Sequence, residues 1–254
     1  MATSVLVTRP AGQGQALLQS LRDVGCEPVQ HQPMLELEPL TELPPNQHQH
    51  LLDLDLYQHI IFISANAVRF GLERIDDYWP QLPAGVHWYA IGGTTAKLLQ
   101  QRGLRPLVPA EEINSEGLLE LAQLKEVAGQ RVLIVKGLGG RETLRETLGN
   151  RGAKVDELAC YQRICPRLAP GALAQMMSRQ ATDVVMISSG EGLSNMLTLL
   201  SDKESTNFRD IGLIVPSPRV AALARQAGFN DVVTAANASD AAMLQALQQW
   251  RAGD

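Results

Sequence analysis

Short apolar runs alternate with amphipathic stretches along the whole chain. The runs are nearly continuous in Val, Ile, Leu, Phe or Met, and they cover Ser4–Thr8, His59–Ser64, Trp88–Gly92, Arg131–Lys136, Asp183–Ser188 and Gly212–Pro216. Continuous apolar runs are typical of strands that are covered on both faces, as in parallel sheets. Each run is followed by small or polar residues and then by apolar residues at helical spacing. This alternation predicts an α/β fold with parallel sheets.

Glycines mark the predicted helix ends. They stand where the chain should leave a helix and return to a strand, at Gly25, Gly103, Gly152 and Gly228. Four further short strands are predicted beyond them, at Pro28–Gln32, Arg105–Val108, Lys154–Glu157 and Asp231–Thr234.

The second half of the chain repeats the first. The segment Val5–Gly12 reads almost in phase with Val132–Gly139, which comes 127 residues later. In the same way, Ile61–Asn66 aligns with Met186–Gly190, and Tyr89–Gly93 aligns with Ile214–Pro218. Self-similarity at so long a period predicts two equivalent domains rather than a solenoid of small units. Two similar lobes usually meet at one cleft, where we expect the function to lie.

Two proline-containing stretches interrupt the alternation of predicted strands and helices at corresponding places in the repeats, near residues 37–45 and 161–167. Prolines there suit extended linkers. Tandem domains need one linker, whereas two linkers indicate that the chain leaves a first lobe, builds the second and returns. We favour this crossed arrangement, with residues 1–37 and 167–254 in lobe 1 and residues 38–166 in lobe 2. A proline-rich loop inside a tandem domain would produce the same pattern.

Composition and charge narrow the class of protein. The net charge of −5 argues against non-specific binding to nucleic acid, which needs a basic stripe. The chain shows no signal-peptide pattern and no apolar run long enough to cross a membrane. The three cysteines have neither metal-ligand nor redox spacing. We therefore expect a cytoplasmic protein, and, since no exposed apolar stripe is evident, a monomer.

The loops that follow the six strands share a small, polar composition. In open parallel sheets, ligands bind beyond the carboxyl ends of the strands and against helix N-termini. Such loops offer free backbone N–H groups and partial positive charge, which together bind anions. The alternative is that their serines, threonines and asparagine only cap helices and their glycines only make turns. The candidate binding residues are Arg9, Ser64, Ala65, Asn66, Gly92, Thr94, Thr95, Lys136, Gly137, Ser188, Ser189, Gly190, Ser217 and Arg219.

Other motifs are weak. Gly12-Gln13-Gly14 lacks the third glycine of a dinucleotide loop, because Leu17 stands there. This makes a two-lobed nucleotide-using transferase an unfavoured alternative. His48, His50 and His59 lie near one another in sequence, and a solvated surface explains them better than a metal site does.

Tyr161 follows Cys160 at the start of the second linker. A tyrosine at a domain junction can point its phenol into a cleft and donate a proton or a hydrogen bond. Packing at a hinge is the alternative explanation, and the pattern alone leaves both open.

Four segments together resemble the uroporphyrinogen-III synthase family. They are Thr8-Arg9-Pro10, the run Phe62–Val68, the run Ala90–Ala96 and Tyr161-Gln162-Arg163. Each is short and degenerate, but their order and spacing are specific, and the resemblance covers essentially the whole chain.

This resemblance implies two flavodoxin-like lobes joined by a two-stranded linker. It also implies the reaction, in which the linear tetrapyrrole hydroxymethylbilane is closed to uroporphyrinogen III with inversion of ring D. The family reaction runs through an azafulvene and a spiro-pyrrolenine and needs no cofactor. A transient contact with the enzyme that supplies this substrate is a further expectation.

Within this family pattern, Tyr161 is the candidate acid that helps the hydroxyl leave as water. Because phenols are weak acids, we expect activity to depend on it only in part. The substrate is an octacarboxylate, which fits loops that bind anions largely through backbone amides, with Arg9, Lys136 and Arg219 as additional cations. Where some family members carry Gly-Pro-Thr-Thr, this chain has Ser217–Val220, so Arg219 could replace a threonine contact. A non-catalytic tetrapyrrole-binding sensor remains the main alternative.

Overall fold

The computed structural model describes residues 2–110, 113–140 and 142–253. The remaining residues of the predicted lobes, at positions 1, 111–112, 141 and 254, lie outside the described residues. The chain divides into two compact units, of which unit 1 comprises Met1–Glu36 with Ile164–Asp254 and unit 2 comprises Leu37–Arg163. These limits lie one residue before the first predicted lobe boundary and three before the second.

Unit 1 is built on one five-stranded sheet. Its strands are β1 (Thr3–Val7), β2 (Cys26–His31), β8 (Val184–Met186), β9 (Gly212–Val215) and β10 (Val232–Thr234). They lie in the order β10-β9-β8-β1-β2, and every neighbouring pair is parallel. The helices are α1 (Gln15–Asp23), α8 (Ala172–Arg179), α9 (Gly190–Leu199), α10 (Asp202–Asn207), α11 (Pro218–Gln226) and α12 (Asp240–Ala252).

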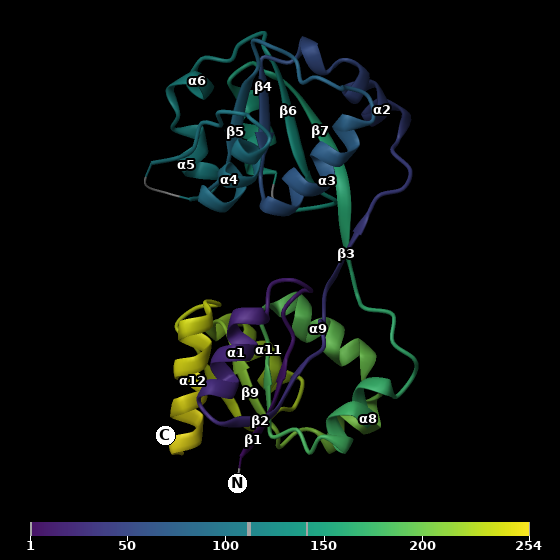
Figure 1. Cartoon of the computed structure of the whole chain (residues 1–254), viewed down its shortest axis with the longest axis vertical. Coiled ribbons are helices and arrows are strands. Elements are labelled where there is room, and N and C mark those ends of the chain that lie inside the picture. Colours follow the sequence, from purple (N-terminus) through teal and green to yellow (C-terminus); the bar gives the residue numbers. More distant parts are fainter. Residues whose placement is uncertain (1, 111–112, 141, 254) are drawn as a thin grey trace. The chain divides into compact units, whose positions relative to one another are not determined.

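Unit 2 holds the second five-stranded sheet, in the order β3-β7-β6-β4-β5 (Figure 1). Its strands are β3 (Glu36–Pro39), β4 (His59–Phe62), β5 (His87–Ala90), β6 (Arg131–Gly137) and β7 (Lys154–Ile164), and β7, β6, β4 and β5 are parallel. The helices are α2 (Pro45–Leu52), the 3-10 helix η1 (Leu54–Leu56), α3 (Ala65–Asp76), α4 (Gly93–Gln101), α5 (Ser115–Leu119), α6 (Ala122–Lys125) and α7 (Thr143–Asn150). The predicted α/β class with parallel sheets is confirmed.

Each sheet is covered on both faces, which explains the continuous apolar runs. In unit 1, α1 and α12 pack on one face and α8, α9 and α11 on the other. In unit 2, α3 and α4 pack on one face and α5, α6 and α7 on the other. The equivalent N-cap residues of the two repeats also share an extended backbone, with φ and ψ of −165° and 163° at Ser64 and of −160° and 161° at Ser189.

The glycines that were predicted to end helices do so for a conformational reason. Gly25, Gly103, Gly152 and Gly228 all have φ between 76° and 94°, directly after the C-caps of α1, α4, α7 and α11. A side chain is strained in this left-handed region, so glycine is the favoured residue there.

Two sequence-based expectations need correction. Arg105–Val108 does not form a strand, because only Leu107 makes a single bridge, to Tyr89. The strand predicted at Lys154–Glu157 continues to Ile164, so Tyr161, which the sequence placed at the start of the second linker, lies within β7. The predicted first linker contains the short strand β3, which pairs with β7 at the edge of this sheet.

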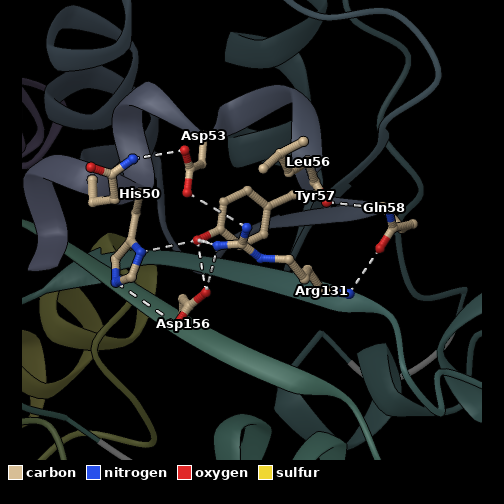
Figure 2. Close-up of polar contacts among 8 residues, drawn as sticks. His50, Asp53, Leu56, Tyr57, Gln58, Arg131 and Asp156 are labelled. Atoms are coloured by element: carbon tan, nitrogen blue, oxygen red, sulfur yellow. Dashed lines mark hydrogen bonds and ion pairs between the residues drawn. The ribbon is translucent and has the colours of Figure 1, made fainter.

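A cluster of polar side chains lies at the amino ends of β4 and β6 in the second sheet (Figure 2). The Tyr57 hydroxyl donates to Asp156 Oδ2 at 2.8 Å and lies 3.1 Å from His50 Nδ1. Arg131 donates to both Tyr57 Oη and Asp156 Oδ2, and its other guanidinium nitrogen lies 3.6 Å from Asp53 Oδ2. Burial and the hydrogen bond to Asp156 raise the pKa of Tyr57, which keeps the phenol a neutral donor. The cluster thus joins α2 and η1 to the starts of β4, β6 and β7.

We expect Tyr57→Phe to lower the free energy of unfolding by about 1–3 kcal/mol, because Asp156 and Arg131 lose a shared, buried partner. Urea unfolding measures this change. Tyr78→Phe is the matched control, since the Tyr78 hydroxyl makes its contact with His48 at the surface. Equal effects of the two substitutions would contradict the importance of the buried cluster.

His59 differs from the solvated surface histidine that the sequence predicted, because it is buried at the start of β4. Gln130 Oε1 can only accept, so His59 Nε2 donates to it and Nδ1 accepts from the Tyr89 hydroxyl at 2.8 Å. The His59 ring also stacks on His87 at 5.5 Å between centroids. Burial lowers the pKa of His59, the hydrogen bond to Gln130 partly offsets this, and His87 lowers it further.

This burial predicts a loss of stability in acid. Because the folded-state pKa of His59 lies below its ordinary value of 6.5, the unfolded chain binds the proton first as the pH falls. The contribution is complete above that value and is lost as the pH drops through the folded-state pKa. We therefore expect the Tm to fall as the pH drops below 6.5, and to fall less in His59→Gln. His48→Gln controls for the loss of a histidine as such. An unchanged pH slope in His59→Gln would refute this assignment.

Candidate functional site

In each sheet there is one pair of neighbouring strands from which the following connections run toward opposite edges of the sheet. In unit 1 this turning point lies between β1 and β8, and in unit 2 it lies between β6 and β4. Ligands of open α/β sheets bind beyond the carboxyl ends of the strands at such a point. The loops that the sequence selected follow these four strands and also β5 and β9, so the predicted residues lie at the carboxyl ends of the strands in each sheet.

Three predicted residues meet in unit 2. The Tyr161 side chain extends from β7, is 2% exposed and stacks on Phe70 with 5.2 Å between ring centroids. Its hydroxyl lies 3.2 Å from Ser64 Oγ, and its ring lies against Gly137. The phenol end of a mostly buried tyrosine is thereby placed beside the loop that follows β4.

Ser64 has two roles at this point. It is the N-cap of α3, and its Oγ accepts the Ala67 N–H at 2.9 Å. A hydroxyl group has one proton and two acceptor positions. Ser64 can therefore donate its proton to Tyr161 Oη while it caps the helix, which leaves the phenol proton available. Ala65 and Asn66 follow in the first turn of α3, and both are half-buried.

Gly137 is needed for its lack of a side chain. A Cβ at this position would lie 2.7 Å from Cζ of Tyr161. The register of β6 and β7 shifts between Lys136 and Gly137, and the Leu138 N–H donates to the Tyr161 carbonyl at 2.7 Å. Any larger residue would move the phenol.

Lys136 points toward the opposite face of the sheet from Tyr161. It is 5% exposed, and its Nζ lies 2.9 Å from Glu157 Oε1. A cavity of about 320 Å³ opens beside this pair, with Arg145 and Arg163 among its lining residues. Sequence reasoning did not select Arg145, Glu157 or Arg163 as site residues. Because side chains alternate between the two faces of a strand, the sequence could have placed Lys136 and Glu157 on the same face of β6 and β7.

The loop after β5 supplies three more predicted residues. Gly92 is the N-cap of α4, Thr94 is exposed in the first turn, and Thr95 is buried.

In unit 1, the loops after β8 and β9 lie next to each other. Ser189 caps α9 by accepting the Gly192 N–H at 3.0 Å, and Ser217 caps α11 by accepting the Val220 N–H at 3.4 Å. The exposed Arg219 guanidinium lies 3.6 Å from the point where a Cβ of Gly190 would stand. Half-buried Ser188 precedes the α9 cap.

The capping explanation is therefore confirmed for Ser64, Ser189 and Ser217. Capping leaves other N–H groups of the first helical turn unpaired. Binding of an anion at these turns stays a prediction.

Arg9 is engaged within unit 1. It lies 2.6 Å from Asp240 Oδ1 and donates to the Ala238 carbonyl at 2.5 Å. Its Nε is buried and makes no hydrogen bond within the described part of the chain. These contacts hold Arg9 against the N-terminus of α12.

The cysteines are free. Burial raises the pKa of the Cys160 thiol to about 12, so it is an unreactive neighbour of Tyr161. Among the described residues, no group of three or more His, Cys, Asp or Glu side chains is placed to hold a metal ion. No helix within the described ranges has the length and apolar character needed to cross a membrane.

Comparison with known proteins identifies relatives over nearly the full length. The family model described as uroporphyrinogen-III synthase HemD matches residues 15–245. The uroporphyrinogen-III synthase of Escherichia coli (strain K12) is 36% identical over 250 residues, which cover 96% of this chain and all of the relative. That of Salmonella typhimurium (strain LT2) is 36% identical over 251 residues, with the same coverage.

Solved structures share the fold. A uroporphyrinogen-III synthetase from Helicobacter pylori superposes with a TM-score of 0.60 at 16% identity, covering 98% of this chain and 99% of that one. A mutant uroporphyrinogen III synthase from Thermus thermophilus gives 0.59 at 15% identity, with full coverage of both chains. The family match and the 36% identity to full-length relatives together show that this chain belongs to the uroporphyrinogen-III synthase family.

Proposed function

We propose that Tyr161 is the general acid of this enzyme and that the loops at the carboxyl edges of both sheets bind its substrate. The reaction is that of the family: the enzyme closes hydroxymethylbilane to uroporphyrinogen III with inversion of ring D. One observation supports the role of Tyr161 above all, namely the contact of its hydroxyl with Ser64 Oγ beside Gly137 at the turning point of the second sheet.

The first chemical step would use the phenol proton. As the C–O bond of the hydroxymethyl group breaks, its electron pair leaves with the oxygen, which takes the proton from Tyr161 and departs as water. The electron pair of the pyrrole nitrogen forms the new exocyclic double bond. After attack, fragmentation and reclosure, the last ring loses a C–H proton and returns it to the phenolate. The enzyme is thus regenerated, and one water is lost overall.

Ser64 would position this acid. Its cap bond to Ala67 orients Oγ, and donation of its proton to Tyr161 Oη directs the phenol proton away from Ser64. The same donation would stabilise the phenolate after proton transfer. Because Tyr161 is nearly buried while Ser64 is half-buried, the serine is the more accessible member of the pair.

Binding would rest mainly on backbone donors. The first turns of α3, α4, α9 and α11 begin at the candidate loops, and their unpaired N–H groups suit carboxylates. Exposed Arg219 is available to such a ligand, whereas Arg9 is engaged with Asp240. Lys136 is paired with Glu157, so we assign it a supporting role.

A wider proposal concerns the domain organisation, cofactor need and oligomeric state of the protein. We propose that the two units act as flavodoxin-like lobes joined by a two-stranded linker, formed where β3 and β7 pass between them. Because the reaction removes water without net oxidation, we propose that it needs no cofactor. We also propose a cytoplasmic monomer that contacts the enzyme supplying its substrate only transiently.

The first experiment is a coupled assay in which hydroxymethylbilane is generated in situ and the porphyrin isomers are separated after oxidation. We expect the type III isomer to exceed the spontaneous type I product. Only type I product from folded protein, together with tetrapyrrole binding, would favour a sensor instead. Stabilisation by a nucleotide would favour a transferase.

For Tyr161→Phe we expect kcat to fall about 10- to 100-fold, because the proton donor is lost. The Tm should change little, since one hydrogen bond contributes about 1 kcal/mol. Ser64→Ala should also lower kcat while removing an N-cap worth about 1 kcal/mol. Steady-state kinetics and thermal unfolding measure both effects.

Ser201→Ala is the matched control for the serine. It removes the cap of α10, where the Ser201 hydroxyl bonds to Glu204 rather than to a tyrosine. Its kcat should equal that of the wild type. Wild-type turnover in Tyr161→Phe would reduce Tyr161 to a positioning residue, and equal losses in both serine variants would assign the Ser64 effect to capping.

A further inference from the structure

The cavity beside Lys136 is a pocket of unit 2 that the proposed chemistry does not use. It lies at the carboxyl edge of the second sheet, where Ile63 follows β4 and Ile91 follows β5. Its wall includes Ile134, which belongs to the hydrophobic core on the face of α5 and α7. Tyr161 belongs to the core on the other face. The pocket and the Tyr161 phenol therefore both lie near the carboxyl ends of the strands, but on opposite faces of the same sheet.

The charges of this pocket are unusual for the protein. Three cations and one carboxylate line it, which gives a net charge of +2 in a chain of net charge −5. Lys136 and Glu157 neutralise each other at 2.9 Å, and the Lys136 side chain is only 7% exposed. The surplus positive charge thus comes from Arg145 and Arg163.

The two arginines are available to a ligand. Arg145 is exposed, and its partner Glu142 lies at 3.2 Å, also in solvent. Such surface pairs contribute little, so a ligand carboxylate can replace Glu142. Arg163 is exposed, and its guanidinium makes no hydrogen bond or ion pair with the residues that the structure describes. Guanidinium groups bind carboxylates in a two-pronged geometry.

The remaining walls and the size define the ligand. Ile63, Ile91 and Ile134 offer apolar surface to a ring. The volume of about 320 Å³ is at the lower end of the range for small-molecule sites, roughly 300–1,000 Å³. One substituted ring fits such a space, and a whole tetrapyrrole does not. Each pyrrole of an octacarboxylate carries two carboxylates, which match the two surplus cations.

We propose that this pocket is a subsite for one pyrrole ring of the substrate, with Arg145 and Arg163 binding its two carboxylates above the Lys136–Glu157 pair. This inference rests on the proposed function, because the ligand is a part of its substrate. An anchored ring restricts the motion of the linear chain, and closure with inversion depends on how the chain is held.

Kinetics of arginine variants test the subsite. We expect Arg145→Gln and Arg163→Gln each to raise KM for hydroxymethylbilane by about 5- to 10-fold with little change in kcat, because each loses one charge-assisted contact. The double variant should also yield a larger share of the type I isomer. Arg102→Gln is the matched control, since Arg102 forms an exposed pair with Asp76 elsewhere in unit 2. Its KM should equal that of the wild type.

Direct binding separates failure of the subsite from failure of the proposed function. The probe is a synthetic monopyrrole that carries one acetate and one propionate, titrated into the full-length protein by calorimetry. We expect binding that is lost in the double variant and for the dimethyl ester of the probe.

Wild-type KM in the double variant, in an enzyme that makes the type III isomer, would overturn the subsite alone. Probe binding that depends on both arginines, in a protein without synthase activity, would retain the pocket and overturn the reaction. Inorganic phosphate binding as tightly as the probe would overturn the choice of a pyrrole.

Discussion

The parallel direction of the strands is the constraint on which the rest of this protein depends. Parallel neighbours cannot be joined by a tight turn, so each strand must be followed by a crossover that returns the chain to the start of the next. Every loop after a strand therefore opens on the same edge, and every helix that follows presents its N-terminus there. In both units this edge collects the serine caps of α3, α9 and α11, with their backbone donors.

A buried tyrosine at that edge gains its position from residues that contribute no charge. Gly137 lets β6 approach the ring, and Ser64 fixes the hydroxyl while it caps a helix. Preorganisation of this kind costs nothing during the reaction. Under the proposed function, oriented dipoles and a few arginines would replace a basic surface in binding a polyanionic ligand to this acidic chain.

The two edges of the second sheet differ in what they contribute. The amino ends of its strands carry the cluster of Tyr57, Arg131 and Asp156, which bond to one another, and the buried His59, which bonds to Tyr89 and Gln130. The carboxyl ends carry the exposed Arg145 and Arg163 and the first turns of α3 and α4. Under the proposed function, the groups at the amino ends would stabilise the fold and those at the carboxyl ends would bind and convert the substrate.

The sequence by itself determined the α/β class, the two repeats and the glycines that end helices, because apolar periodicity and left-handed turns are local properties of the chain. It also selected the candidate loops, since each directly follows a strand. Tertiary structure decided which of those residues meet. It buried Tyr161 in β7 against Gly137, paired Lys136 with Glu157, engaged Arg9 with Asp240, and brought Arg145 and Arg163 to one pocket. These contacts join residues far apart in the chain, and their partners are set by strand order and register, which no local pattern encodes.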